Sequence, residues 1–395
     1  MNIQTAVIFG GRSVEHEVSI LTGMQVIAAL GAKYNPVPLY IAKDGVMYSG
    51  EEFGRLETFR DLPRSLDEGR QVTLMRDGGK IVLRPTAKRL FGADKAVTVD
   101  VVIPAVHGTF CEDGSLQGML ELLGIPYCGC DVLSSALCMD KPVSKALLRA
   151  AGLPVLPDTL LERGAYNDDP DAAMDALEAA MAYPVIVKPA NLGSSVGIGK
   201  AADRAALRKA LELAFTFSSR VLAEPAIEPL REINVAVLGN ADGARASVCE
   251  EPLGQDEILS YADKYQSGSK NNVSGGGAKG MSGARRVIPA ELSPAMTERA
   301  QTLAVEAFRT LGCSGVVRVD FLLDGSGDLY VNELNTLPGS LAFYLWEKTG
   351  LSFSLLLEEL VSLAFARHRA RGALTFTYNT NLLSSANLRG GKGKL

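Results

Sequence analysis

One stretch of the chain places a lysine and a run of glycines and serines directly after a short apolar segment, Val185 to Val187. Lys188 ends what reads as a buried strand, where an unpaired ammonium is costly to desolvate, so it needs an anionic partner. Gly193, Gly197 and Gly199 follow, and glycines let a backbone approach a polyanion closely and turn N–H groups toward it. The pattern predicts a phosphate-binding loop; an ordinary glycine-rich hairpin with a surface lysine is the alternative.

Two common phosphate-binding sequences do not fit this stretch. The P-loop pattern would require glycine at Ser194 and serine or threonine at Ala201. The glycines at 197 and 199 loosely match a dinucleotide fingerprint, but the strand ends too early to lead into it.

A second group of polar residues lies on two predicted strands that form a hairpin near the C-terminus. Arg318 and Asp320 share one strand face, because side chains at i and i+2 point the same way, and Glu333 and Asn335 repeat this spacing on the partner strand. Such oxygen ligands suit Mg²⁺ beside transferring phosphates, and an arginine there can stabilise developing negative charge. Cross-strand salt bridges are the alternative interpretation.

The elements that position these residues begin with a βαβ unit: a strand over 6–9, a helix over 18–30 and a strand over 37–41. Gly10 and Gly11 follow the first strand at its carboxyl end, where ligands bind in open parallel sheets. Residues 51–95 read as an elaboration, and 261–286 as a long glycine-rich loop of the functional or disordered kind. The remaining predicted strands lie at 99–104, 185–187, 221–224, 233–238, 315–322 and 329–334, and the remaining helices at 116–123, 140–150, 168–182, 202–217, 294–311 and 350–367.

Composition narrows the class of protein. A chain of 395 residues suits two or three domains, and 47% hydrophobic with 22% charged residues is typical of a globular protein. The net charge of −5 argues against a nucleic-acid partner. The sequence shows no signal-peptide pattern, no bilayer-spanning apolar run and no C-x-x-C among its cysteines. We therefore expect a cytoplasmic protein without a membrane partner.

Taken in chain order, six motifs resemble those of the D-alanine–D-alanine ligases of the ATP-grasp superfamily, over nearly the whole chain from Val7 to about Phe353. The motifs are Gly10-Gly11-Arg12-Ser13-x-Glu15, His107-Gly108-x-x-x-Glu112-Asp113-Gly114, Asp140-Lys141, Val187-Lys188-Pro189-Ala190-Asn191-Leu192-Gly193-Ser194-Ser195-Val196-Gly197, Arg318-Val319-Asp320, and Asn332-Glu333-Leu334-Asn335-Thr336-Leu337-Pro338-Gly339.

This resemblance implies an α/β fold in which two α+β subdomains of the ATP-grasp type grip ATP, preceded by a Rossmann-like N-terminal domain. The implied division is an N-terminal domain over 1–132, a central subdomain with the phosphate loop over 133–226, a C-terminal subdomain with the lid loop and metal site over 227–373, and a tail over 374–395.

The resemblance also implies cofactors and residue roles: ATP, and two Mg²⁺ ions with Mn²⁺ as a substitute. The residues it assigns to ATP are Lys141, Lys188, Gly193, Ser195, Val196, Glu224, Glu232 and Lys264. The metal ligands it implies are Asp320, Glu333 and Asn335. The catalytic positions it implies are Glu15, Ser194, Tyr265, Arg318 and Gly339, and the substrate contacts are Glu15, His107, Ser340 and Leu341.

The implied reaction joins two D-amino acids through an acyl phosphate, most simply D-alanine to D-alanine for peptidoglycan precursors. Partners would be small amino acids, with a homodimer as the assembly usual in the resembling family. A ligase using D-serine, D-lactate or another amine as second substrate is the main alternative. An ATP-binding regulator without turnover is another, although it would not need Arg318, Asp320, Glu333 and Asn335 together; a dehydrogenase is a distant third.

The chain departs from the family pattern in three places. Residues 228–232 are one residue longer than the usual turn before the ribose-binding glutamate, and the lid over 266–286 is longer and richer in glycine. After Gly339 the chain continues as Ser340-Leu341 and reaches Gly350 several residues early. We therefore expect a conserved donor site and an altered acceptor site, with Ser340 and Leu341 as the candidate replacement contacts.

Overall fold

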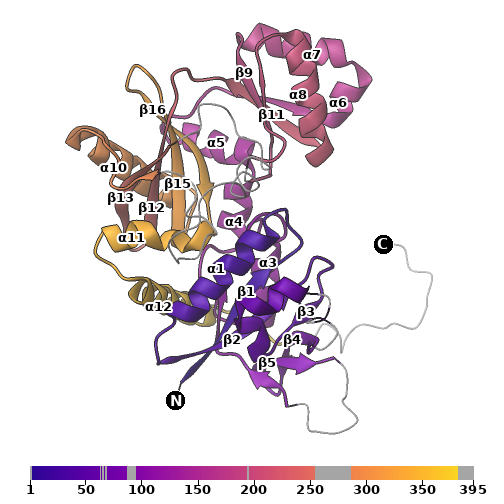
Figure 1. Ribbon diagram of the computed structural model, residues 1–395, viewed down its shortest axis with the longest axis vertical. Helices are drawn as coiled ribbons and strands as arrows, with labels where there is room; N and C mark the ends of the chain where they lie inside the picture. The colour runs from indigo at the N-terminus through magenta and orange to yellow at the C-terminus, as the bar shows by residue number, and fades with distance from the viewer. Residues whose placement is uncertain are drawn as a thin grey trace.

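The protein is described by a computed structural model over residues 2–62, 64, 66, 69–86, 95–193, 195–253 and 286–380. Figure 1 shows three units along its long axis, each centred on a main β-sheet, and the sheets belong to successive parts of the chain. This arrangement confirms the mixed α/β class and the ATP-grasp type of fold that the motifs implied.

The N-terminal unit is organised around β1 (Ile3–Gly10), which lies between β2 (Tyr34–Ile41) and β7 (Val101–Pro104) and runs parallel to both. Helix α1 (His16–Ala29) connects β1 to β2, so the predicted βαβ unit is confirmed. Most of β1 is buried, as expected for a central parallel strand covered on both faces. The smaller elements are β3 (Met47–Tyr48), η1 (Glu51–Gly54), η2 (Leu56–Asp61), β4 (Val72–Asp77), β5 (Lys80–Pro85), β6 (Val97–Thr98) and α3 (Ser115–Leu123).

The central unit contains an antiparallel sheet in the order β10-β9-β11-β8, with three helices gathered on one side of it (Figure 1). Aspartates at 169 and 203 start two of these helices by accepting backbone N–H groups, a common N-cap arrangement. The elements are β8 (Thr159–Glu162), α6 (Arg163–Asp168), α7 (Pro170–Ala180), β9 (Val185–Pro189), β10 (Gly199–Ala201), α8 (Arg204–Phe217) and β11 (Arg220–Pro225).

The C-terminal unit is a five-stranded sheet in the order β14-β13-β12-β15-β16, with every neighbouring pair antiparallel. The predicted hairpin of β15 and β16 is confirmed. The elements are β12 (Arg231–Gly239), β13 (Ala244–Pro252), β14 (Arg286–Val287), α10 (Pro294–Thr310), β15 (Gly315–Leu323), β16 (Leu329–Asn335), η4 (Gly339–Ala342), α11 (Phe343–Lys348) and α12 (Phe353–Gly372).

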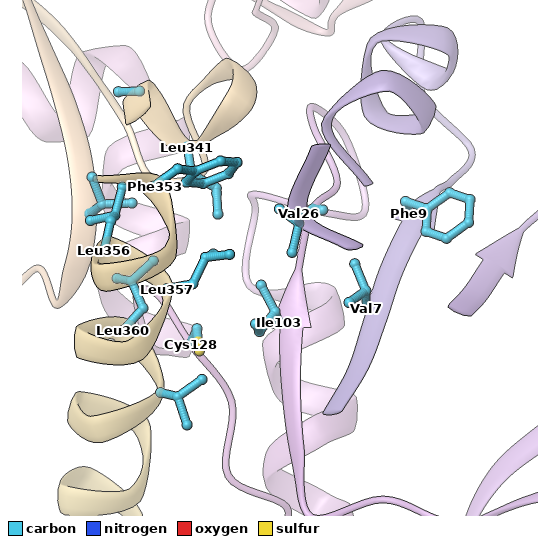
Figure 2. Packing of buried hydrophobic residues seen from close by; sticks show 14 of the residues in the cluster. Val7, Phe9, Val26, Ile103, Cys128, Leu341, Phe353, Leu356, Leu357 and Leu360 are labelled. Carbon is cyan, nitrogen blue, oxygen red and sulfur yellow. The ribbon is translucent and has the colours of Figure 1, made fainter. Parts of the chain in front are cut away.

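A single apolar core joins the N-terminal and C-terminal units, and we call it the apolar junction. Val7 and Ile103 from the N-terminal sheet belong to the same buried cluster as Leu341, Trp346 and Leu356 from the end of the chain. Figure 2 shows side chains of α12 and the segment before it lying across from the strands of the N-terminal sheet. These two units are therefore packed together like parts of one domain.

Two helices that precede the central sheet pack with the C-terminal unit. They are α4 (Val132–Met139) and α5 (Lys141–Ala150), and their Cys138 and Leu148 are buried in the core of the five-stranded sheet. The central sheet has a separate core of its own around Val185, Leu211 and Val221. The proposed boundary at residue 133 stays a prediction, although the packing groups α4 and α5 with the C-terminal sheet.

Several elements escaped the sequence patterns. Helix α4 follows a capping box between Asp131 and Ser134, but it is short and its residues are mostly small. Strand β13 carries two glutamates near its end, and β-propensity is low for glutamate, so its alternating pattern was hidden. Within the described ranges no single helix is long and apolar enough to cross a membrane; only the bent pair 339–348 and 353–372 meets that test together, with 117° between its members.

Candidate functional site

Three buried lysines meet where the central sheet approaches the C-terminal sheet. Lys188, at the end of β9, lies 2.5 Å from Glu224 Oε2 and 3.1 Å from Asn332 Oδ1 of β16. Lys141, at the start of α5, lies 3.1 Å from Glu333 Oε2 and donates a 2.7 Å hydrogen bond to the carbonyl of Leu192. The structure therefore brings the two predicted lysines to the loop and to the metal-site strand, as the motifs implied.

Lys145 is the third of these buried lysines, and sequence reasoning missed it. It is 1% exposed and forms an ion pair with the other carboxylate oxygen of Glu224. Its spacing of four residues from Lys141 on one helix was the available signal, because i and i+4 share a helix face. We call Lys141, Lys145, Lys188, Glu224 and Glu333 the charged junction.

The charged junction is short of negative charge. Burial, and after it the charge of Lys188, lowers the pKa of Lys145 to about 6. Burial and the charge of Lys141 lower the pKa of Lys188 to about 8. Burial alone would raise the pKa of Glu333, but Lys141 and Lys188 outweigh it and hold that pKa at about 2. Since nearby negative charge favours the protonated lysines, a bound polyanion would restore their charge.

The glycine-rich loop joins β9 to β10 and borders the N-terminal unit. Gly197 has φ +74°, and a Cβ there would lie 2.7 Å from the ring of Phe217, so both its conformation and its space favour glycine. Ser195 also has a positive φ, and Val196 is buried. A Cβ on Gly193 would lie 3.3 Å from Glu15 Oε2, so the loop reaches the N-terminal unit.

The predicted metal ligands and Arg318 lie together on β15 and β16. Arg318 pairs with Asn335 in the strand register, and Asp320 pairs with Glu333. The Arg318 guanidinium donates two 2.7 Å hydrogen bonds to Asp320, and Asn335 Nδ2 donates one of 2.9 Å to Asp320 Oδ2. The shared strand face is confirmed, and the ion pair lies within one strand rather than across two.

These side chains fit a divalent cation. Burial raises the pKa of Asp320 against the opposing charge of Arg318, and the carboxylate of Glu333 adds to the rise. A divalent cation beside Asp320 and the ionised Glu333 would offset the repulsion that raises the pKa of Asp320. No cluster of three or more His, Cys, Asp or Glu side chains suited to a metal occurs in the described residues, so Asn335 and phosphate oxygens would have to complete the ligand set.

A chain of hydrogen bonds fixes the segment before Gly339 to the N-terminal unit. His107 Nδ1 lies 2.8 Å from the Leu337 carbonyl, which can only accept, so this nitrogen carries the proton. Its Nε2 then accepts from the hydroxyl of Thr22 at 2.8 Å, and that hydroxyl accepts from the Ser340 N–H at 3.2 Å. Burial lowers the pKa of His107 to about 4, so the ring is neutral at pH 7 and holds this segment in place.

Glu112 provides a second connection that sequence reasoning did not single out. Its carboxylate accepts from the N–H of Gly108 at 2.8 Å and from the N–H of Leu337 at 2.9 Å. Burial, and then the charge of Glu15, raises the pKa of Glu112 to about 8. The two carboxylates thus lie near each other where the N-terminal unit faces the site, a suitable place for an ammonium group.

The segment after Gly339 turns inward. Ser340, Leu341 and Ala342 have φ of 54°, 51° and 51°, a left-handed run that L-residues rarely adopt. The Leu341 N–H donates to the Pro338 carbonyl at 2.8 Å, and its side chain is buried in the apolar junction. Both N–H groups that would have offered a carboxylate grip at Ser340 and Leu341 are therefore engaged within the protein.

Of the remaining predicted residues, one lies within the described part of the chain and three lie outside it. Glu232 lies on β12 opposite Leu322, at the edge of the charged junction. Ser194, Lys264 and Tyr265, together with most of the predicted lid, lie outside the described residues.

Comparisons with known proteins agree along the whole chain. Residues 4–130 match the family described as "D-ala D-ala ligase N-terminus", and residues 147–362 match "D-ala D-ala ligase C-terminus". The D-alanine–D-alanine ligase A of Salmonella typhimurium is 37% identical over 383 residues, covering 95% of this chain and 99% of that protein. The D-alanine–D-alanine ligase of Thermosipho africanus is 35% identical over 382 residues, covering 96% and 98%.

Two solved structures have the same overall form. The D-alanine-D-alanine ligase from Coxiella burnetii is 30% identical with a TM-score of 0.77, covering 94% of this chain and 96% of that one. The VanG D-Ala:D-Ser ligase from Enterococcus faecalis is 32% identical with a TM-score of 0.75, covering 92% and 100%. With both family halves matched in order around the lysines and carboxylates described above, the chain belongs to the D-alanine–D-alanine ligase family.

Proposed function

We propose that this chain is an ATP-dependent, ADP-forming ligase that joins two D-amino acids, with D-alanine–D-alanine ligation for peptidoglycan precursors as its reaction. One observation carries the proposal: Lys141 of the charged junction pairs with Glu333, which lies opposite Asp320 in the sheet, and Lys188 contacts the adjacent Asn332. Cations suited to phosphates next to carboxylates suited to Mg²⁺ support the proposal, and family membership supports the reaction class.

The nucleotide would lie along the charged junction. Lys141 and Lys188 would contact its phosphates, with the loop from Gly193 through Ser195 and Val196 folded over them. Lys145, which pairs with Glu224 on β11, would add a third positive charge when the phosphates are bound, while Glu232 would hold the ribose. Lys264 belongs to the same proposed set by resemblance.

Asp320, Glu333 and Asn335 would hold Mg²⁺, which when bound neutralises phosphate charge during transfer. The family pattern suggests two ions, with Mn²⁺ as a substitute. Asp320 also orients Arg318, because it accepts two hydrogen bonds from the guanidinium.

The first amino acid would bind with its ammonium group at Glu15, close to Glu112. Its carboxylate would lie between Arg318 and the N–H of Gly339, where a developing oxyanion can be stabilised. His107 acts here as a positioning residue, since both ring nitrogens bind the protein. Ser194 and Tyr265 would help to place the second amino acid.

The reaction then follows in two steps. A carboxylate oxygen of the first D-alanine attacks the γ-phosphorus of ATP, and ADP leaves. The amine of the second amino acid attacks the acyl carbonyl, inorganic phosphate leaves, and the amine loses a proton. Because the acyl phosphate hydrolyses readily, the site must exclude water during both steps.

The first experiment measures ATP-dependent phosphate release with D-alanine alone, with products identified by mass. Release with formation of the D-alanyl-D-alanine dipeptide supports the proposal. ATP binding without phosphate release, under all second substrates offered, would contradict it and favour a regulatory protein.

A second candidate is a ligase with another acceptor, such as D-serine. The observation that favours it is the engagement of the Ser340 and Leu341 N–H groups within the protein. One similar structure is named a D-Ala:D-Ser ligase. Competition between D-alanine and D-serine in one reaction, read by mass, decides between them.

The proposal extends to location and assembly. The cytoplasm is the expected compartment, because ATP and peptidoglycan precursors meet there. A homodimer is the expected assembly from family resemblance alone, and light scattering of the purified protein measures it. The division at residues 132, 226 and 373 is likewise a proposal, which limited proteolysis can examine.

A further inference from the structure

A charged cluster lies toward the β14 edge of the C-terminal sheet, whereas the lysines contact β16 at its opposite edge, and the reaction described above does not use this cluster. It consists of Glu250 on β13, Arg286 at the start of β14 and Tyr344 on α11. Glu250 Oε1 lies 3.1 Å from Arg286 Nη1, and the Tyr344 hydroxyl donates to Glu250 Oε2 at 3.1 Å. We call these three residues the arginine cluster.

Glu250 is an anchor within this cluster. It is only 2% exposed, and Asn234 Nδ2 contacts its Oε2 at 3.4 Å. A carboxylate this deeply buried is costly unless it is paired and hydrogen-bonded, and here Arg286 and Tyr344 supply both. The position of Glu250 is therefore set by the sheet, and it in turn sets the position of Arg286.

Arg286 is the outward-facing member. Its guanidinium lies 4.7 Å from the centre of the Tyr344 ring, so the ion pair and the ring restrain it from two directions. Its side chain is 24% exposed, compared with 3% for Glu250. A guanidinium held in this way is a pre-oriented cation whose planar fork suits a carboxylate.

Tyr344 connects the arginine cluster to the reaction centre. Burial raises the pKa of Tyr344, and its hydroxyl also interacts with Arg318. One phenol ring therefore separates Arg286 from the arginine that faces the acyl carbonyl. The backbone N–H groups of Ser340 and Leu341, which could otherwise bind the carboxylate of the attacking amino acid, are already engaged, so another cation near Arg318 is needed for that carboxylate.

We propose that Arg286 binds the carboxylate of the second amino acid, with Glu250 and Tyr344 as its positioning residues. This rests on the proposed ligase function and deepens it. The chemistry selects a small amine that carries a carboxylate, such as D-alanine or D-serine, over a neutral amine of the same size.

The test uses Arg286→Gln in the full-length protein with ATP and Mg²⁺. D-Alanine and D-alaninamide are supplied at equal concentration, and the two products, D-alanyl-D-alanine and D-alanyl-D-alaninamide, are separated by mass. D-Alaninamide lacks the carboxylate and can only act as the second substrate. The product ratio does not depend on how much enzyme is folded.

We expect the parent protein to favour the dipeptide, and Arg286→Gln to shift the ratio toward the amide by about 10- to 100-fold, as expected for the loss of a charge-assisted contact. Glu250→Gln should shift it in the same direction by less. Arg245→Gln is the matched control. Arg245 lies on β13, next to the strand of Arg286, and like Arg286 it pairs with a carboxylate, Glu359, and lies over an aromatic ring, Trp346. Arg245→Gln should leave the ratio unchanged.

The outcomes separate the two proposals. A parent protein that makes dipeptide, with an Arg286→Gln ratio equal to that of the parent, overturns the role of Arg286 and leaves the ligase function intact. A parent protein that makes neither product overturns the ligase function itself.

Discussion

The apolar junction and the charged junction differ in what each needs to stay closed. The apolar junction buries side chains such as Ile103 and Leu356, and this burial needs no ligand. The charged junction connects the central sheet to α5 and β16 through Lys145–Glu224 and Lys188–Asn332 contacts. Its three buried lysines outnumber its two glutamates, and the lowered pKa values of Lys145 and Lys188 show that their charged forms would be favoured by a bound anion.

Because only the charged junction is short of negative charge, we expect the two junctions to have separate roles. The apolar junction keeps Glu15, His107 and Arg318 in one frame, which is what orienting two amino acids requires. On the proposed function, the charged junction would respond to the nucleotide. Substitutions at the charged junction should therefore lower kcat/KM most. Substitutions at the apolar junction should first lower the free energy of unfolding or misplace the residues that orient the amino acids.

The largest effect is expected for Lys188→Met. This change removes a phosphate-facing cation and leaves Glu224 with one partner, so kcat/KM should fall by about 1,000-fold or more, the scale of a lost electrostatic contact in a water-poor site. Phosphate release measures it. Lys200→Met is the control: Lys200 lies on neighbouring β10, is half exposed and pairs with Glu228 at the surface. Similar activity in both variants would remove the charged junction from the reaction.

A smaller effect is expected for Thr22→Val, which keeps the shape of Thr22 but removes the hydroxyl between His107 and Ser340. The loss of these two hydrogen bonds should cost about 1–3 kcal/mol of unfolding free energy. The kcat should fall by about 10-fold, since the Gly339 N–H lies in the segment that loosens. ATP affinity should stay unchanged, because the Thr22 hydroxyl bonds His107 and Ser340, which are not members of the charged junction.

Thr22→Ser is the control for this experiment, since it retains the hydroxyl. Full activity of Thr22→Val would show that the hydrogen-bond chain does not hold the segment in place. A fall in ATP affinity equal to the fall in kcat would show that the two junctions are not separate.

The smallest effect is a pH dependence of stability at His107. The folded pKa of about 4 lies below the ordinary value of 6.5, so this histidine contributes stability that is complete above pH 6.5 and is lost as the pH falls toward 4. Between pH 7 and pH 5 the loss should be about 2 kcal/mol. Urea unfolding at several pH values measures it.

His107→Gln is the matched variant, because its amide can donate to Leu337 and accept from Thr22 without titrating. The difference in stability between the two proteins should narrow as the pH falls from 7 to 5. A constant difference would mean that the ring is not held neutral.

Much of the site could be predicted where it is local in sequence. The spacing of Arg318 and Asp320 fixed their common strand face, and the apolar run before Lys188 fixed the place of that lysine. Period-two and glycine patterns carry such information because they depend on near neighbours alone. The same reasoning located the βαβ unit and the hairpin.

The rest depends on contacts between distant residues. Glu112 meets the N–H of Leu337 across 225 positions of sequence, which no local pattern encodes. Ser340, Leu341 and Ala342 rarely adopt a left-handed backbone conformation. The burial of Leu341 in the apolar junction, which no local pattern predicts, accounts for it here. The pairing of Glu224 on β11 with Lys145 on α5 likewise depends on tertiary packing, although the spacing of Lys145 four residues after Lys141 was visible.

The hydrogen-bond chain through His107 also has a consequence for how the protein acquires activity during folding. Its contacts join residues separated by 230 and 318 positions, so they close some of the longest loops in the chain. Loops of that length form late, after local helices and hairpins. In a refolding reaction we expect helical circular dichroism to return first and ligase activity to lag behind it, which makes activity a reporter for the final docking of the chain's two ends.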